Sequence, residues 1–149
     1  MYKLIHKDKK SKSLSFRHKN KTNLISINYY INLLKKISNN FTQHSRICLY
    51  HSKTDTLHQM LICQPHKFFP EIKKHPKKNK IYQIIRGKQK IIIFNKSKKI
   101  IKEFKIDKKN FMLCLDKNQW HQNISLTKYS IHLETIGGPF KRNEDRTYL

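Results

Sequence analysis

The chain has 149 residues and a formal net charge of +24. This length fits one domain with a modest core, and the lack of any apolar stretch of roughly 20 residues excludes a helical membrane span. The first residues are also too polar for a secretory signal peptide, so we expect a soluble, cytoplasmic protein.

The first 22 residues carry eight Lys or Arg side chains against one acid, Asp8, and show no sustained period. Such a segment is typical of a disordered basic arm, so we expect an arm over residues 1–22 and a domain over residues 23–149. Two interpretations of the positive charge stay open. One is a polyanion or nucleic-acid partner bound by this arm and by the lysine loop at residues 73–80. The other is drift in a bacterial, A/T-rich genome, because the chain has 28 Lys against 5 Arg, 20 Ile and 12 Asn, and no Ala or Val. Specific nucleic-acid readers favour Arg, so specific nucleic-acid binding is not expected.

Residues 26–38 ("SINYYINLLKKIS") predict one amphipathic helix. Ser26 is a suitable N-cap. The apolar positions follow helical spacing and predict a stripe that packs on a larger body. These positions are Ile27, Tyr30, Ile31, Leu34 and Ile37.

From residue 46 the pattern changes to short apolar runs separated by turn residues, which predicts an all-β sandwich or small barrel over about residues 46–140. Gly87 follows one run and predicts a tight reversal of the chain. The expected strands are residues 46–51, 57–63, 81–85, 89–94, 99–106, 111–115, 120–125 and 129–136.

The three cysteines lie far apart, each inside an apolar run, and no CxxC pair occurs. An odd number at these spacings argues against a disulfide framework or a zinc ribbon. We therefore expect Cys48, Cys63 and Cys114 to be buried thiols in a reducing compartment.

Two stretches keep the spacing of the metal motifs of a cupin barrel while changing half of the ligands. In those motifs, His-x-His is followed by a Glu four residues on and a Gly six residues after it, and a later Pro-x-Gly turn precedes one more His. Here Lys73-x-His75, Lys80 and Gly87 match the first motif. The second is matched by "LDKNQWH" at residues 115–121, which ends on His121. Lysine thus stands where the first His and the Glu would be.

The order of several segments between about residues 23 and 145 resembles one family, the WbuC-type cupin-fold proteins. The segments that resemble it are "LISINYYINLLKKI", "SRICLYHSKTDTLHQMLI", "HP" at residues 75–76, "IIRGKQKIIIFNKSKKI", "WHQN" and "LETIGGPF". The resemblance implies a cupin double-stranded β-helix, or jelly-roll barrel, with one N-terminal α-helix. It also implies a bacterial protein linked to surface-polysaccharide gene clusters (O-antigen, lipopolysaccharide) that binds metal and has no settled reaction.

Three interpretations of the site stay open. In the first interpretation, the pocket no longer binds a ligand, and Lys73 and Lys80 point to the solvent. Alternatively, His75 and His121 still hold a divalent metal (Zn, Fe or Mn), helped by Gln83 or Glu71, although two ammonium groups would repel a dication and favour weak or no binding. In the third interpretation, Lys73 and Lys80 replace the cation and bind an anion such as a sugar phosphate or carboxylate.

Other features give weaker expectations. Gln83 and Trp120 are possible pocket residues, with rim packing expected for Trp120, and Glu134 is expected to pair with a Lys or Arg. Catalysis is not evident, because the chain has no Ser-His-Asp order, glycine-rich phosphate loop or His-Glu-x-x-His motif. A small-molecule partner is expected, and a homodimer is a further possibility.

Overall fold

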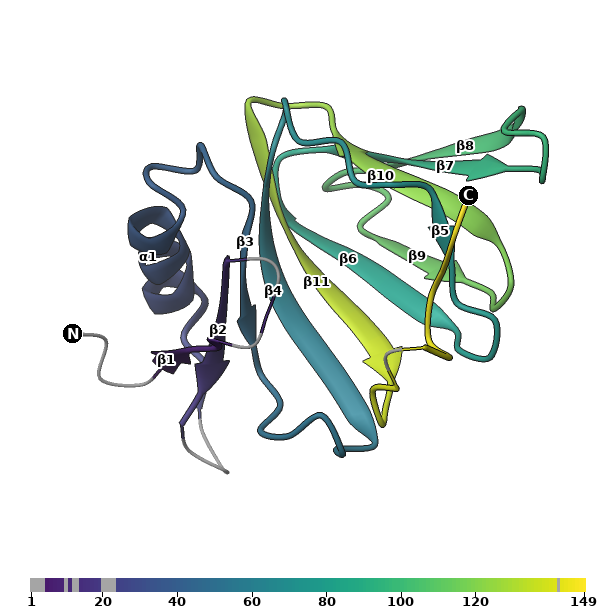
Figure 1. The fold of residues 1–149 in the computed structure, drawn as a ribbon. Helices are drawn as coiled ribbons and strands as arrows, with labels where there is room; N and C mark the ends of the chain where they lie inside the picture. Colours follow the sequence, from purple (N-terminus) through teal and green to yellow (C-terminus); the bar gives the residue numbers. More distant parts are fainter. Residues whose placement is uncertain (1–4, 10, 12–13, 20–23, 142) are drawn as a thin grey trace.

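The computed structural model describes residues 5–9, 11, 14–19, 24–141 and 143–149, and this part of the chain is mainly β-structure with one helix (Figure 1). The predicted all-β barrel with an N-terminal helix is confirmed, and each of the eight expected strands is present. The elements in chain order are β1 (Ile5–Lys7), β2 (Leu14–His18), α1 (Ile27–Ile37), β3 (Ser45–Cys48), β4 (Leu57–Pro65), β5 (Lys73–Lys74), β6 (Lys80–Arg86), β7 (Gln89–Phe94), β8 (Ile100–Ile106), β9 (Met112–Leu115), β10 (Trp120–Ser125), β11 (Tyr129–Gly137) and β12 (Thr147–Tyr148).

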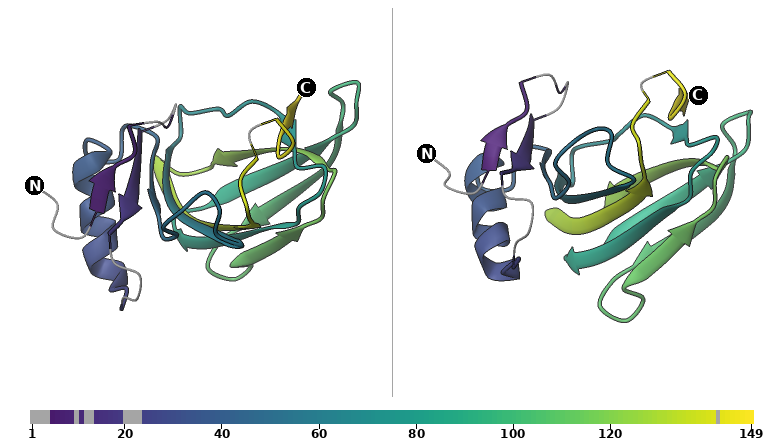
Figure 2. Two further views of the ribbon diagram at one scale, coloured as in Figure 1. Left: turned by 60° about the horizontal axis from the view of Figure 1, so that its bottom comes forward. Right: turned by 90° about the horizontal axis from the view of Figure 1, so that it is seen from below.

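The strands form two sheets. The larger sheet has the order β1-β2-β3-β4-β11-β6-β9, and the smaller sheet has the order β12-β5-β10-β7-β8. Many neighbours within a sheet are distant in sequence, such as β4 with β11 and β5 with β10, as expected when a chain winds back and forth between two sheets. Figure 2 shows the two sheets curving around a common interior.

The helix covers the outer face of the larger sheet. It starts after Ser26, whose side chain accepts a hydrogen bond from the Tyr29 amide. Its buried side chains, Tyr30, Leu33, Leu34 and Ile37, pack in one cluster with Ile47, Leu61, Cys63 and Ile131 of β3, β4 and β11. Leu33 therefore belongs to the stripe in place of Ile27, which is 43% exposed. Because strand side chains alternate between the two faces, the intervening residues of β3, β4 and β11 turn to the interior.

The described part of the predicted basic arm is ordered as strands, which corrects the expectation of a disordered segment. β1 pairs antiparallel with β2, and β2 runs parallel to β3, with α1 in the crossover between them. Within β2, Phe16 is buried on the helix side, and on the other side Arg17 forms a 2.9 Å ion pair with Asp8. These strands have three and five residues, too short to give a visible period among so many lysines. The remaining positions of the predicted arm, residues 1–4, 10, 12–13 and 20–22, lie outside the described residues.

Two of the three cysteines are buried as expected, and one is not. Cys48 and Cys63 are buried free thiols, whereas Cys114 is exposed. The reason is that Cys114 lies on β9, the edge strand of the larger sheet, and points away from Leu113 and Leu115, which belong to the interior cluster.

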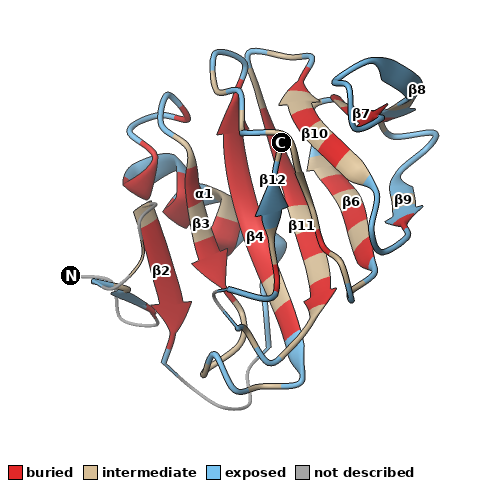
Figure 3. Ribbon diagram, turned by 45° about the vertical axis from the view of Figure 1, so that its right-hand side comes forward, coloured by how far each residue is buried: buried red, intermediate tan, exposed pale blue. Residues whose placement is uncertain are grey.

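Figure 3 shows how burial differs between strands, with β4 largely buried and β8 largely exposed. No helix in the described ranges combines the length and apolar character needed to cross a membrane.

Gly87 closes the β6–β7 hairpin, as predicted. Its φ is +80°, and a Cβ atom there would lie 2.5 Å from Thr127 Oγ1 and 2.7 Å from the Tyr129 carbonyl oxygen. We expect Gly87→Ala to lower the free energy of unfolding by about 1–3 kcal/mol, measured by urea denaturation. Gly137→Ala is the matched control, because no atom lies within 4 Å of its added Cβ, and its stability should be unchanged or slightly higher. Equal effects of the two substitutions would contradict this account.

Candidate functional site

The register of the larger sheet places a row of polar side chains on its inner face. In the β6–β11 pair, Tyr82 lies opposite Glu134, and Ile84 lies opposite His132. Lys80 is two residues before Tyr82, so it shares this face. Strand geometry alone therefore gathers an ammonium, a phenol, a carboxylate and an imidazole in the interior.

The two histidines identified from the sequence lie opposite this row, on the side of the smaller sheet. β5 meets β10 where Lys73 lies opposite His121, and His75 lies two residues further along. The structure brings the two imidazoles together, with ring centroids 5.8 Å apart. Asn118, in the glycine position of the second motif, has a φ of 64°, and its amide donates a 2.7 Å hydrogen bond to the His75 carbonyl oxygen. This turn ties the loop after β5 to the start of β10.

Side chains of both sheets line a cavity of about 870 Å³. This volume lies in the range of about 300–1,000 Å³ that is common for small-molecule sites. Lys73, His75, His132 and Glu134 line it, whereas His121 lies behind them and is 1% exposed.

Lys80 and Glu134 form a buried ion pair, with 3.3 Å between Lys80 Nζ and Glu134 Oε1. Lys80 Nζ also donates a 3.3 Å hydrogen bond to the Tyr82 hydroxyl. Burial alone would raise the pKa of Glu134, but the ammonium groups of Lys80 and Lys73 hold it well below its usual value, so the carboxylate is ionised. The prediction that Glu134 pairs with a lysine is confirmed. Lys80 is inside the protein, and the interpretation that it turns to water is wrong.

The two predicted histidines are held as neutral rings with the same tautomer. Nδ1 of His75 lies 2.6 Å from the Asp145 carbonyl oxygen, and Nδ1 of His121 lies 2.8 Å from the Gln119 carbonyl oxygen. Because a carbonyl only accepts, each Nδ1 must carry the proton, which leaves a lone pair on Nε2. Both Nε2 atoms are buried and have no hydrogen-bond partner in the part of the chain that the structure describes. Burial and the Lys80 ammonium lower the pKa of His75 well below its usual value and that of His121 to about 3.

His132 is a site residue that the sequence reasoning missed. Its Nδ1 accepts a 2.8 Å hydrogen bond from Gln89 Nε2, so the proton is on its Nε2, which is buried and unpartnered. Burial lowers the pKa of His132 to about 3. The spacing of two residues from Glu134 on one strand was a signal that could have found it.

Lys73 is half-buried in the cavity wall. Burial, and after it the neighbouring Lys80 ammonium, lower the pKa of Lys73 to about 7. The Glu134 carboxylate acts in the opposite direction and raises the pKa of Lys73, but that carboxylate is already paired with Lys80. Arg146 also lines the cavity, and its guanidinium lies 5.6 Å from the centre of the Phe140 ring. No motif or spacing in the sequence pointed to this arginine.

Gln83 and Trp120, the two other predicted pocket residues, do not line the cavity. Strand alternation explains this result, because Lys80 and His121 point inward. Residues an odd number of positions away on the same strand, such as Gln83 and Trp120, point outward. Gln83 lies opposite Leu133 and Met112 on the outer side of the sheet. The Trp120 ring instead packs under the Lys74 ammonium at 4.8 Å, as a surface contact.

The residues present do not fit a resident divalent metal. Within the described ranges, no three His, Cys, Asp or Glu side chains are grouped so that they could hold an ion. His75 and His121 supply two neutral nitrogens, and the expected third ligand position is occupied by Lys80, whose ammonium would repel a dication. Of the proposed helpers, Gln83 faces outward and Glu71 is exposed at the cavity rim.

Comparison with protein-family profiles and with curated protein sequences found no match to this chain. Solved structures, in contrast, show that the chain has the cupin fold. CapF of Staphylococcus aureus, a capsular polysaccharide assembling protein, has a TM-score of 0.57 at 15% identity, over 67% of this chain and 30% of that one. A Bacillus subtilis oxalate decarboxylase with Mn(II) centres has a TM-score of 0.51 at 15% identity, over 64% of this chain and 24% of that one. The DMSP lyase DddQ of Ruegeria pomeroyi has a TM-score of 0.55 at 13% identity, over 70% of this chain and 51% of that one. This chain therefore spans less than a third of CapF.

Proposed function

We propose that this cupin barrel binds a small hydroxylated anion, of the class of sugar phosphates or sugar carboxylates. The observation that carries the proposal is the surplus of cations in the cavity. The Lys80 and Glu134 charges cancel, while Lys73 and Arg146 line the same space with no ion pair to a carboxylate in the described residues. Because a buried charge without a counter-charge is unfavourable, an anionic ligand would complete the site.

The imidazoles beside these cations suit the hydroxyl groups of a sugar. Nε2 of His75 is a free acceptor and Nε2–H of His132 is a free donor, and both rings line the cavity. A hydroxyl group can donate to the first and accept from the second. Burial holds the pKa of both rings far below 7, so these roles are unchanged across the physiological range.

The sequence resemblance to WbuC-type proteins supports a biological setting for such a ligand. We propose that the protein acts in bacterial surface-polysaccharide metabolism. The fold of CapF, a protein named for capsular polysaccharide assembly, is in keeping with this setting. In this proposal the fixed ammonium of Lys80 takes the place of the metal ion.

The alternative of polyanion binding through the basic arm and the 73–80 loop receives less support. Lys73 and Lys80 lie inside, and Lys77 and Lys78 are paired with Glu144 and Asp145 at 3.5 and 2.8 Å. The loop therefore presents few unpaired charges to a large polyanion. Heparin binding that weakens when Lys77 and Lys78 are both changed to Gln would support this alternative.

Isothermal titration calorimetry with glucose 6-phosphate tests the proposal. We expect binding that weakens about tenfold or more in Lys73→Met, because a hydrogen bond between charged groups is worth about 1.5–3 kcal/mol. Lys74→Met is the matched control. It removes the same charge one residue away, from a side chain that bonds to Asn118 at 2.7 Å, and its affinity should be unchanged.

The same titration distinguishes the anion from the metal interpretation. Protein treated with a chelator and shown to be metal-free by elemental analysis should bind glucose 6-phosphate as tightly as untreated protein. Loss of binding after chelation, or equal losses in Lys73→Met and Lys74→Met, would contradict the proposed site.

A further inference from the structure

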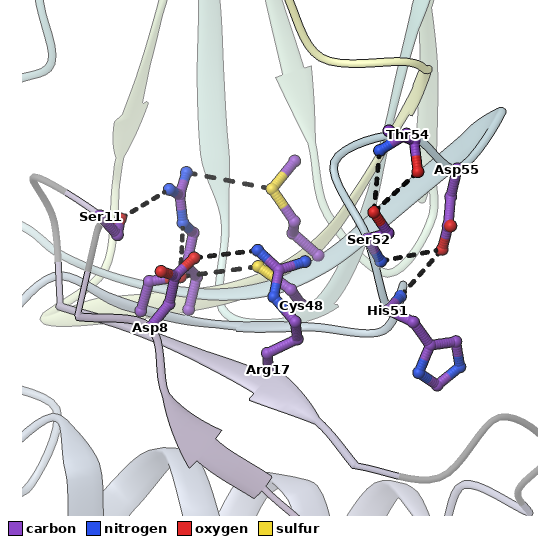
Figure 4. Close-up of polar contacts among 11 residues, drawn as sticks. Asp8, Ser11, Arg17, Cys48, His51, Ser52, Thr54 and Asp55 are labelled. Carbon is purple, nitrogen blue, oxygen red and sulfur yellow. Dashed lines mark hydrogen bonds and ion pairs between the residues drawn. The ribbon is translucent and has the colours of Figure 1, made fainter.

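We propose that the cavity has a second anion subsite on the wall built by the N-terminal strands, so that the ligand carries two separated anionic groups. This inference rests on the proposed function for the first subsite, formed by Lys73 and Arg146. The second subsite consists of Arg46 on β3 and Arg17 on β2, with Ser11 and Asp8 beside them. Figure 4 shows Arg17, Asp8 and Ser11 on this wall.

The sheet register places these arginines on the inner face. Arg46 lies opposite Ile62 on β4, and Ile62 lies opposite His132 on β11. Arg17 lies opposite Cys48 on β3, Cys48 lies opposite Met60 on β4, and Met60 lies opposite Glu134 on β11. Since adjacent strands are about 4.8 Å apart, the backbone at Arg46 is about 10 Å from the backbone at His132. Lys73 and Arg146 of the first subsite instead come from β5 and from the segment before β12, so different elements supply the two pairs of cations that line this cavity.

The contacts of Arg46 leave its positive charge without a counter-charge. Its Nε donates a 3.1 Å hydrogen bond to Ser15 Oγ, and its Nη2 donates a 3.1 Å hydrogen bond to Ser11 Oγ. Its Nη1 lies 4.0 Å from Met60 Sδ. All three acceptors are neutral, and no carboxylate in the described ranges forms an ion pair with it. These contacts hold the guanidinium in one orientation at the cavity wall without neutralising it.

Arg17 adds an unused donor beside it. The residue is 9% exposed, and its Nη2 pairs with Asp8 at 2.9 Å. Its Nη1 is buried and has no hydrogen-bond partner among the described residues, although the side chain lines the cavity. Among the described residues of this wall, two guanidinium groups face one carboxylate and leave a net charge of +1, and buried donors without acceptors are unfavourable. A phosphate or carboxylate group would supply both the missing charge and the missing acceptors.

The size of the cavity leaves room for such a ligand. At about 870 Å³ it lies near the upper end of the range for small-molecule sites. A sugar with one phosphate at the Lys73 end would leave the arginine wall unfilled, whereas a sugar with anionic groups at both ends would reach both.

Two sugar phosphates that differ only in the second phosphate test this inference. Glucose 1,6-bisphosphate should bind the wild-type protein about tenfold or more tightly than glucose 6-phosphate, since the added phosphate gains charge-assisted hydrogen bonds. Arg46→Gln should remove this preference while leaving glucose 6-phosphate binding within about twofold of wild type. Arg86→Gln, which removes an exposed arginine outside the cavity, controls for the overall charge and should keep the preference.

The outcomes separate this inference from the proposed function. If glucose 6-phosphate binds through Lys73 but the bisphosphate binds no more tightly, the second subsite is wrong and the first stands. If neither compound binds the wild-type protein, the proposed function fails and the second subsite with it. Should Arg46→Gln fail to fold, Arg46→Lys keeps a cation at the wall and should retain a preference for the bisphosphate over the monophosphate. Absence of that preference would overturn the inference.

Discussion

Lys80→Met is expected to lower the free energy of unfolding by about 3–5 kcal/mol, the usual effect of removing one partner of a buried ion pair. Lys80 is 2% exposed and Glu134 is 7% exposed, so the substitution leaves a buried carboxylate without its counter-ion. The effect should be measured by urea denaturation at pH 7 and checked by circular dichroism of the folded variant. Lys90→Met is the matched control, because Lys90 pairs with Glu103 at 3.1 Å on the surface, where such a pair contributes less than about 1 kcal/mol.

A double variant shows whether the unpaired charge is the cause. Lys80→Met combined with Glu134→Leu removes both charges and should recover most of the lost stability, because well-packed apolar residues can replace a buried ion pair. If the double variant is less stable than Lys80→Met alone, the loss comes from packing, and the assignment of an ionised pair is wrong.

The affinity for glucose 6-phosphate is expected to fall as the pH rises from 7.5 to 9, by up to about tenfold per pH unit. Lys73 has a pKa of about 7 in the free protein because of burial and the Lys80 ammonium. A bound anion favours the charged form and raises this pKa, so binding takes up a proton between the two values and weakens as protons become scarce. The phosphate itself is fully ionised above its second pKa of about 6, so it does not contribute in this window. The charged groups that act on Lys73 are Lys80, Glu134, Arg146 and Arg46.

Lys73→Arg is the control for this pH dependence. The arginine stays charged throughout the window, so its affinity should be flat between pH 7.5 and 9. A wild-type affinity that is also flat, or an equal slope in the two proteins, would show that Lys73 is not the titrating group.

Strand alternation and turn residues were sufficient to predict most of the fold. The eight apolar runs became strands because each has a side that faces the interior, and Gly87 ends one of them at a positive φ. β5 and β12 have two residues each and could not be recognised, since a two-residue segment has no period. They form through pairing with partners distant in the chain, and Thr147 lies opposite Lys74.

The site was predictable only in part. The spacing of the cupin motif predicted that His75, His121, Lys73 and Lys80 share one interior. In the structure these side chains lie close together there. Applying the period of two consistently from Lys80 and His121 would have excluded Gln83 and Trp120. The arginines could not be found in this way. Arg146 follows β11 in an irregular segment, and Arg17 lies in a lysine-rich stretch on β2, which pairs with β3.

The cavity wall depends on both ends of the chain. Arg17 enters from β2, and the last residues supply Arg146 and the Asp145 carbonyl that orients His75. During synthesis β2 leaves the ribosome well before Asp145 and Arg146 do. A nascent chain therefore holds no complete binding site until that later segment has emerged, and ligand binding can stabilise only molecules in which both segments are in place.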